Sequence, residues 1–185
     1  MPANNLTAIS SKPRPARTVA EKMIKVDHAG ENGAVNIYRA QRLVARIRAP
    51  SLLQQLAEFQ QHEEEHRRIF REHLDKIGVR RCVSYHFCCV GGFSLGFVTG
   101  LIGPSAIAAT TFAVEHVVLR HLEDQLEYLR HASPEARDCV TRIYEDEREH
   151  HDAAKARLSR DGWLTRSLIA VVQLCTEQVI RIGMR

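Results

Sequence analysis

A pattern of glutamates and histidines that occurs twice is the feature that most constrains this chain of 185 residues. In each copy a glutamate is followed 32 residues later by Glu-x-x-His, and the second copy begins 84 residues after the first. The two copies comprise Glu31, Glu63 and His66, then Glu115, Glu147 and His150. Residues three positions apart share one face of a helix, so each Glu-x-x-His pair can approach one metal ion together. The repetition is consistent with an internal duplication, although the two halves are otherwise little alike.

Apolar stripes with helical spacing accompany these residues and predict that they point into a helical core. We expect a first helix from Thr18 to about Ile47, with Thr18 and Glu21 as its capping box. Further helices are expected over about 50–77, 105–131 and 133–158, followed by an amphipathic helix over about 163–182. Single glutamates on two helices, with Glu-x-x-His on the other two, form the ligand set of ferritin-like bundles. We therefore predict an all-α protein, a ferritin-like four-helix bundle with an additional C-terminal helix.

Four glutamates at core positions would carry four negative charges into the interior of the bundle. An isolated buried carboxylate costs on the order of tens of kcal/mol by Born estimates unless it is neutralised. Two divalent cations supply the required positive charge, and shared carboxylates can bridge two ions about 3.5–4 Å apart. Six ligands exceed the number that one zinc ion takes, and oxygen with imidazole but no thiolate favours iron or manganese. The sequence thus predicts a dinuclear metal site.

A long uncharged segment separates the two copies of the pattern. Residues 82–114 contain no Asp, Glu, Lys or Arg, and Gly92, Gly96 and Gly100 recur at intervals of four. A full membrane crossing here would place the two halves of the site on opposite sides of the bilayer. A monotopic or re-entrant hairpin, broken at Pro104, avoids this conflict and predicts a membrane-facing segment. The alternative is a buried bundle helix whose glycines permit close packing.

Several polar residues lie near the six predicted ligands. Asp27 and His28 precede Glu31 by four and three positions, so either could share its helix face and hydrogen-bond a ligand. Tyr38 and Tyr144 also fall on ligand-bearing faces, and the sequence leaves the roles of these four residues open. Five other residues flank the ligands off the apolar stripe and are expected to face solvent: His62, Glu64, Glu65, Glu149 and His151.

Composition limits the classes of partner. The net charge is +4, but the basic residues are spread along helices rather than interleaved with aromatic residues, which make up 6% of the chain. This distribution argues against nucleic acid and in favour of an anionic membrane surface. Five cysteines, an odd number without a Cys-x-x-Cys pair, predict reduced thiols rather than a disulfide framework or a zinc site.

The N-terminal residues differ in composition from the rest of the chain. Residues 1–17 contain three prolines and no acidic residue, and they lack an apolar run of secretory type. We predict a disordered N-terminal tail over 1–17, with a short organellar transit peptide as the alternative. Residues 18–185 are expected to form one domain that includes the apolar segment at about 82–114.

Short blocks of sequence around the ligands resemble the demethoxyubiquinone hydroxylase family. These blocks are Asp27–Ala34, Glu63–His66, Val114–Glu115 and Asp146–Asp152, within a similarity that covers about residues 20–182. The resemblance implies a membrane-bound di-iron monooxygenase of ubiquinone biosynthesis, which hydroxylates the ring of a demethoxyubiquinone or demethoxyubiquinol. It implies two iron ions per chain held by the six residues of the repeated pattern, O2 as cosubstrate and NADH-derived electrons.

The resemblance also implies where such a protein works and with what. A polyprenyl quinone or quinol dissolves in lipid, which suits a peripheral or monotopic protein on the cytoplasmic face of a bacterial inner membrane. The matrix face of the mitochondrial inner membrane is the alternative. The sequence contains no Gly-x-Gly-x-x-Gly motif, so NADH is expected to bind weakly, act through the quinone, or use a partner. An accessory quinone-presenting protein or a homo-oligomer is compatible with the sequence.

Two other functions use a similar set of ligands. A quinol oxidase of the alternative oxidase type also combines glutamates and Glu-x-x-His with a membrane face, but reduces O2 to water without hydroxylating the quinol. A ferritin-like iron carrier is the second alternative, although a soluble cage has no need of the long uncharged segment. The product of the reaction distinguishes the hydroxylase from the oxidase.

Overall fold

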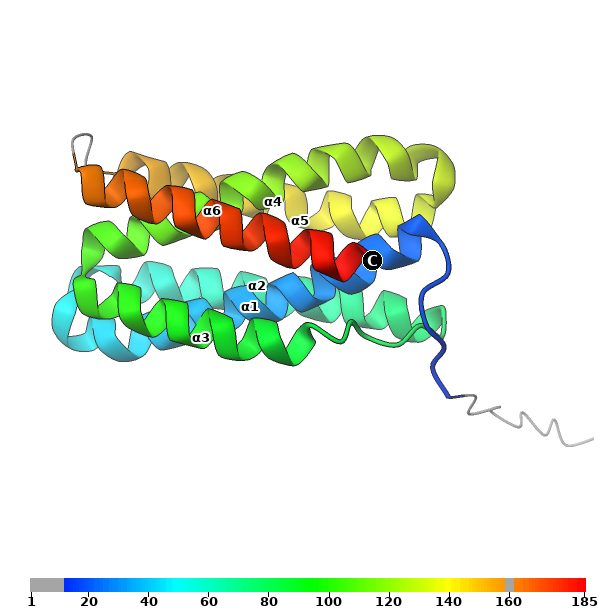
Figure 1. Cartoon of the computed structure of the whole chain (residues 1–185), viewed down its shortest axis with the longest axis horizontal. Coiled ribbons are helices and arrows are strands. Elements are labelled where there is room, and N and C mark those ends of the chain that lie inside the picture. The colour runs from blue at the N-terminus through cyan, green and yellow to red at the C-terminus, as the bar shows by residue number, and fades with distance from the viewer. Residues whose placement is uncertain (1–11, 159–161) are drawn as a thin grey trace, which may run out of the picture.

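A computed structural model describes residues 12–158 and 162–185 (Figure 1). Over these residues the chain is helical, with a short 3-10 turn at Pro50–Leu52 (η1) before the second helix. The helices are α1 (Val19–Arg48), α2 (Leu53–Lys76), α3 (Tyr85–Ile102), α4 (Pro104–Ala132), α5 (Pro134–Ala156) and α6 (Trp163–Met184). The prediction of an all-α protein with an additional C-terminal helix is therefore confirmed.

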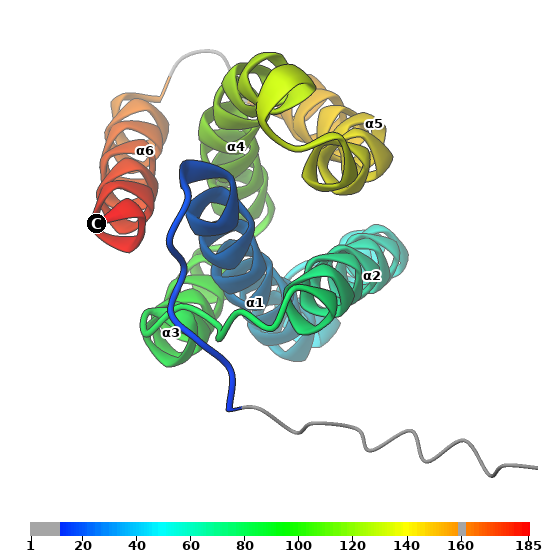
Figure 2. The ribbon, with the colours of Figure 1, turned by 90° about the vertical axis from the view of Figure 1, so that its right-hand side faces the viewer.

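The helices are arranged in three layers of two, which the view along the bundle in Figure 2 makes clear. α1 packs against α2, α4 packs against α5, and α2 faces α5, so that these four helices form the predicted bundle. The outer layer on the other side consists of α3, which lies along α1, and α6, which lies along α4. Each helix carrying part of the repeated pattern therefore belongs to the inner four.

Local sequence signals account for where the helices begin. The hydroxyl of Thr18 accepts a hydrogen bond from the backbone N–H of Glu21, and the Glu21 carboxylate accepts one from the N–H of Thr18. This is the predicted capping box, which satisfies N–H groups that have no partner within the helix. Ser133 caps α5 in a similar way, and Pro104 and Pro134 occupy first-turn positions where a missing N–H costs nothing.

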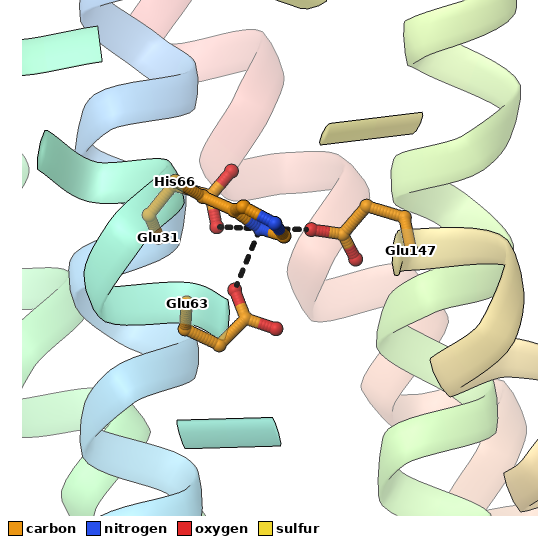
Figure 3. Close-up of side chains that lie close together, drawn as sticks. All are labelled: Glu31, Glu63, His66 and Glu147. Carbon is orange, nitrogen blue, oxygen red and sulfur yellow. Dashed lines mark hydrogen bonds and ion pairs between the residues drawn. The ribbon is translucent and has the colours of Figure 1, made fainter. Parts of the chain in front are cut away.

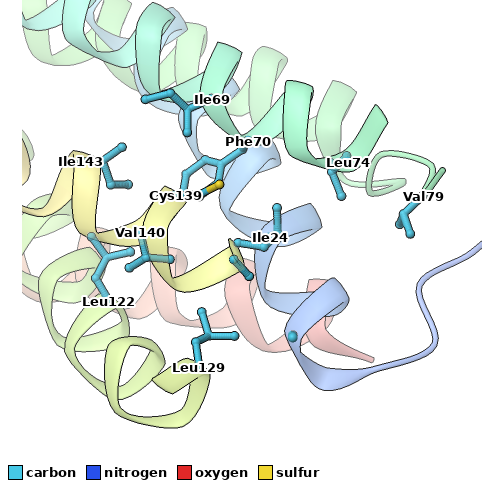
Figure 4. Close-up of a cluster of buried hydrophobic side chains, with 12 residues drawn as sticks. Ile24, Ile69, Phe70, Leu74, Val79, Leu122, Leu129, Cys139, Val140 and Ile143 are labelled. Carbon is cyan, nitrogen blue, oxygen red and sulfur yellow. The ribbon is translucent and has the colours of Figure 1, made fainter. Parts of the chain in front are cut away.

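Two apolar clusters fill the bundle on either side of its middle. One contains Ile24, Phe70 and Val140 and joins α1, α2, α4 and α5 (Figure 4). The other contains Leu56 and Phe59 with residues from the second half of α1. Along each inner helix the residues of the repeated pattern lie between these clusters, so the polar centre is enclosed by apolar side chains from both ends.

The uncharged segment 82–114 forms α3 and the beginning of α4, and α3 is neither fully buried nor free of the bundle. A Cβ atom at Gly92 or Gly96 would overlap the backbone oxygen of Gly33 or Ile37, so glycine is needed for this close approach to α1. Gly103, with φ of +119°, then reverses the chain into α4. The glycine-rich face is therefore packed as a bundle helix would be, as one of the two sequence interpretations proposed.

The opposite face of α3 is apolar and exposed. Phe87 is 80% exposed and Val90 67% exposed, and α6 presents a similar surface that includes Trp163 and Leu174. By length and composition both helices could cross a membrane, a criterion that core helices of soluble proteins also meet. This surface agrees with the membrane-facing segment expected from the sequence, but supports it only weakly.

Residues 1–11 of the expected N-terminal tail lie outside the described residues. Residues 12–17, which the sequence assigns to the same tail, lie against the end of α2. The N–H of Arg14 donates to Gly78 O at 2.9 Å, and the N–H of Arg80 donates to Arg14 O at 2.8 Å. The Arg14 guanidinium also donates to both carboxylate oxygens of Glu21, at 3.0 and 2.6 Å. These bonds explain the ordered placement, which the composition did not indicate.

Candidate metal centre

The six residues of the repeated pattern converge in the middle of the bundle. Each is between 0% and 6% exposed. α1 and α4 contribute one glutamate each, and α2 and α5 contribute Glu-x-x-His; together they are Glu31, Glu115, Glu63, His66, Glu147 and His150. In Figure 3 the imidazole of His66 lies among the carboxylates of Glu31, Glu63 and Glu147. The four inner helices thus bring together residues up to 119 positions apart in the sequence.

The side chains form two overlapping groups, each able to surround one cation. In each group, one ligand atom from every residue lies within 4.8 Å of the others. The first group consists of Glu31, Glu63, His66 and Glu147, and the second of Glu63, Glu115, Glu147 and His150. The shared residues are Glu63 and Glu147, whereas Glu31 and Glu115 each belong to one group only.

Both histidines direct Nδ1 into the cluster. His66 Nδ1 lies 3.0 Å from Glu147 Oε1 and 3.8 Å from Glu63 Oε2. His150 Nδ1 lies 3.2 Å from Glu63 Oε1 and 3.9 Å from Glu147 Oε2. Each imidazole therefore meets the glutamate of its own helix and that of the opposite helix, as expected for ligands that surround common ions.

Unpartnered atoms show that the cluster is suited to cations. Among the described residues, both carboxylate oxygens of Glu63, Oε2 of Glu147 and Nδ1 of His150 are buried without a hydrogen-bond partner. Buried polar atoms are nearly always hydrogen-bonded, so several unpartnered ligand atoms facing one another need an explanation. Two cations among four carboxylates and two imidazoles would satisfy them, and the oxygen-rich donor set without thiolate fits iron or manganese.

The pKa values of the cluster reflect its burial and its excess of carboxylates. Burial raises the pKa of Glu31 well above its usual value, and the neighbouring Glu63 and Glu147 carboxylates raise it further. The pKa of Glu115 is raised in the same way, first by burial and then by the same two carboxylates. Burial also opposes ionisation of Glu63, but the adjacent His150 and His66 outweigh it and lower the pKa of this residue. Cations bound among these carboxylates would therefore offset the repulsion between their buried negative charges.

Of the four residues whose roles the sequence left open, Tyr38 has a direct contact with the cluster. Its hydroxyl donates a hydrogen bond to Glu115 Oε1 at 2.9 Å, and burial together with that carboxylate raises its pKa well above the usual value. Asp27 instead accepts from Gln125 at 2.9 Å, and burial raises its pKa to about 7. His28 stacks on Tyr85 with ring centroids 4.9 Å apart. The Tyr144 hydroxyl donates to Glu123 at 2.8 Å on the surface.

Two residues beside the ligands were not recognised as part of the site. His66 Nε2 lies 3.0 Å from Asp146 Oδ2, and His150 Nε2 lies 3.1 Å from His62 Nδ1. The expectation that His62 faces solvent is therefore wrong, because it contacts His150 between α2 and α5. The same expectation is wrong for His151, which is half-buried and lies 4.9 Å from the ring of Phe112.

The flanking glutamates behave as predicted. Glu64, Glu65 and Glu149 are exposed on the outer faces of α2 and α5. Glu65 pairs with Arg68 at the surface, and that guanidinium lowers the pKa of its carboxyl. These residues share the local sequence of the cluster but not its environment, which makes Glu64 a useful control position.

The fold and the cluster together define a ferritin-like helical bundle with an internal carboxylate–histidine cluster that could hold metal ions. Comparison with known families agrees with this class and narrows it. The family model described as "Ubiquinone biosynthesis protein COQ7" matches residues 18–183. This chain belongs to that family, which confirms the resemblance drawn from the sequence blocks around the ligands.

Curated relatives carry names of one kind. The chain is 35% identical over 164 residues to "NADPH-dependent 3-demethoxyubiquinone 3-hydroxylase, mitochondrial" of Dictyostelium discoideum, which covers 83% of this chain and 74% of that protein. The Bos taurus protein of the same name is 33% identical, over 74% of this chain and 64% of its own length. "3-demethoxyubiquinol 3-hydroxylase" of Acidovorax sp. (strain JS42) is 30% identical, over 84% and 74%. The chain thus spans less than two thirds of the mammalian relative and about three quarters of the other two.

Proposed function

We propose that this protein is a di-iron monooxygenase that hydroxylates the ring of a demethoxyubiquinone or demethoxyubiquinol in ubiquinone biosynthesis. The observation that carries the proposal is the pair of overlapping ligand groups that share Glu63 and Glu147. The names of the relatives, all 3-demethoxyubiquinone or 3-demethoxyubiquinol 3-hydroxylases, support the substrate and the reaction. The class of enzyme follows from the family together with this centre.

In this proposal each group of side chains would hold one iron ion. One position would use Glu31 and His66, the other would use Glu115 and His150, and Glu63 and Glu147 would contribute to both. Two bound iron ions supply the redox chemistry that activates O2 for transfer of one oxygen atom. Overall, one atom of O2 enters the ring and the other leaves as water, which consumes two electrons and two protons.

The protein itself contributes a dry, oriented environment. Apolar clusters above and below the centre exclude water, which strengthens every electrostatic interaction within it. The Tyr38 hydroxyl donates a hydrogen bond to Glu115 Oε1 and so holds that carboxylate in one orientation. The Tyr38 ring lies 6.2 Å from the His150 ring and 5.7 Å from that of Phe59, which keeps it in place.

We further propose that α3 and α6 bring the protein to a lipid surface, where a polyprenyl quinone is dissolved. Their exposed apolar side chains favour a peripheral or monotopic attachment, on the cytoplasmic face of a bacterial inner membrane or the corresponding matrix face. Electrons derive from NADH or a related reductant, directly or through a partner. An accessory quinone-presenting protein or a second copy of the chain is compatible with this surface.

The deciding experiment is the quinone profile of a hydroxylase-deficient strain that expresses this chain, measured by mass spectrometry. Conversion of the demethoxy intermediate to mature ubiquinone is the expected result. Glu63→Ala should abolish conversion and lower the iron content, whereas Glu64→Ala, one position away on the exposed face, should change neither. Persistence of the intermediate with an iron-loaded, membrane-bound protein would contradict the proposal, and activity retained in Glu63→Ala would contradict the ligand assignment.

A further inference from the structure

The two histidines of the cluster differ in what lies behind them. His66 directs Nδ1 inward and Nε2 outward, where Asp146 Oδ2 lies at 3.0 Å. His150 has the same orientation, but its Nε2 meets Nδ1 of His62 at 3.1 Å. One ligand is therefore backed by a carboxylate and the other by an imidazole.

These partners occupy equivalent positions in the two halves of the chain. His62 immediately precedes Glu63, Asp146 immediately precedes Glu147, and they are separated by the 84 residues that relate the two copies of the pattern. Each histidine contacts a residue of the opposite helix, because His66 on α2 meets Asp146 of α5 and His150 on α5 meets His62 of α2. The two partners occupy equivalent positions, but one is a carboxylate and the other an imidazole.

The rings are held firmly enough for this difference to matter. The His62 and His150 rings are nearly parallel, with an interplanar angle of 14° and centroids 5.3 Å apart. Phe59 also packs against His150, with the ring centroids 4.1 Å apart. A hydrogen bond near the ring plane, together with this packing, fixes the direction in which His150 presents Nδ1.

The consequence follows from where the proton lies when Nδ1 binds a metal. The remaining proton is then on Nε2, which must donate it to the group behind the ring. A carboxylate is a stronger acceptor than a neutral imidazole, so His66 becomes the better electron donor to its ion. The Asp146 side chain is 42% exposed, which weakens the difference through solvent screening without removing it.

We propose that His62 and Asp146 are positioning residues that make the two metal positions inequivalent, with the ion at His66 bound more tightly than the ion at His150. This inference rests on the metal ligands of the proposed function. Changes to such outer partners typically alter metal affinity by about 10–100-fold. We expect a difference near the lower limit, about tenfold, because of the exposure of Asp146.

The test uses the metal-free full chain titrated with Co(II), with the visible absorption of the bound ion as the readout. The native chain should bind two ions in separable phases. His62→Asp should raise the Co(II) affinity of the weaker position, whereas Asp146→Asn should lower that of the tighter position. Both variants should therefore reduce the difference in affinity between the two positions. Asp146→Glu, which keeps a carboxylate, should preserve this difference, and Glu64→Gln on the outer face of α2 should leave both phases unchanged.

A second readout separates positioning from a general structural effect. In the Co(II)-loaded chain each ligating imidazole should give one hyperfine-shifted proton signal that exchanges with D2O, from its Nε2–H. Asp146→Asn should move one of these signals and His62→Asp the other. Two indistinguishable phases in the native chain, or variants that move both signals or neither, would overturn the inference. Failure to bind a second ion at all would instead overturn the proposed dinuclear site.

Discussion

α3 and α6 are both apolar helices outside the four-helix bundle, yet they are attached to it in different ways. α3 meets α1 through Gly92 and Gly96, where backbone lies directly against backbone. α6 meets the bundle through side chains, with Val172 buried and Glu177 paired with Arg120 and His121 of α4. α3 can lie where it does because Gly92 and Gly96 have no side chains, whereas α6 is held by the side chains of Val172 and Glu177.

This difference determines how well each contact tolerates a larger side chain. A side chain added to α3 meets the α1 backbone, which cannot rotate away. A side chain added at Gly183 of α6 would meet a methyl group of Val26 rather than backbone. We therefore expect α3 to be intolerant of larger residues on its inner face, and α6 to lose stability gradually as contacts are removed.

The largest effect is expected on membrane binding, if the exposed apolar faces of α3 and α6 contact lipid. Phe87→Ser combined with Phe97→Ser removes two exposed aromatic side chains from α3. Each fully buried Phe contributes about 1.5–3 kcal/mol, so binding to anionic phospholipid vesicles should fall by roughly 100-fold. Co-sedimentation measures this loss, with Tyr128→Ser on α4 as a control, because Tyr128 and Phe97 are exposed to a similar extent. Unchanged binding would remove α3 from the lipid surface and leave α6 as the candidate.

The next effect concerns the inner face of α3. Gly96→Ala places a Cβ atom against the backbone oxygen of Ile37 and should reduce the free energy of unfolding by about 3 kcal/mol, the upper part of the range for overpacking. Gly91→Ala is the matched control, because nothing lies within 4 Å of its added Cβ. That variant should gain up to about 1 kcal/mol from helix propensity. Urea denaturation measures both, and equal effects would show that α3 does not depend on backbone contact.

A smaller loss is expected when the attachment of α6 is weakened. Val172→Ala removes buried methyl groups and should cost about 1.5 kcal/mol, at about 0.8 kcal/mol for each buried carbon. Val171→Ala, one position away and 58% exposed, should cost much less. The same denaturation experiment compares them, and a cost for Val172→Ala as large as that of Gly96→Ala would contradict the distinction between the helices.

The smallest effect depends on pH. A hydrogen bond from His121, with a further contribution from Arg181, lowers the pKa of Glu177 to about 2. A lowered pKa stabilises the fold above the unfolded value near 4.5, and this contribution disappears as the pH falls towards 2. Glu177→Gln should therefore be less stable than the native chain at pH 7, by less than about 1 kcal/mol, and should converge with it in acid. Glu127→Gln, which loses an exposed pair within α4 alone, is the matched control.

Much of the architecture could be predicted because helical periodicity and metal chelation leave strong traces in sequence. The stripe on α2 that carries Glu63 and His66 defines a buried face without reference to any other helix. The roles of His62 and Asp146 could not be predicted, because a residue next to a ligand faces either solvent or a neighbouring helix. The crossing of α2 and α5 decides between these outcomes.

The uncharged segment illustrates a second limit. The sequence allowed either a membrane-facing segment or a buried bundle helix whose glycines permit close packing. In the structure the glycine face of α3 packs on α1, and the opposite face is apolar and exposed. A sequence segment without charged residues does not indicate which face of its helix is buried. The structure was needed to show that α1 covers the glycine face of α3.

The contact of each histidine with the opposite helix also orders events during synthesis of the chain. Glu31, Glu63 and His66 leave the ribosome first, but the partners that complete their surroundings lie on α5, near the other end of the chain. α3 lies between, so its glycine face can dock on α1 while the cluster is still only half present. The α3 part of the exposed apolar surface can therefore form before the carboxylate–histidine cluster is complete, because the residues of α5 are synthesised later.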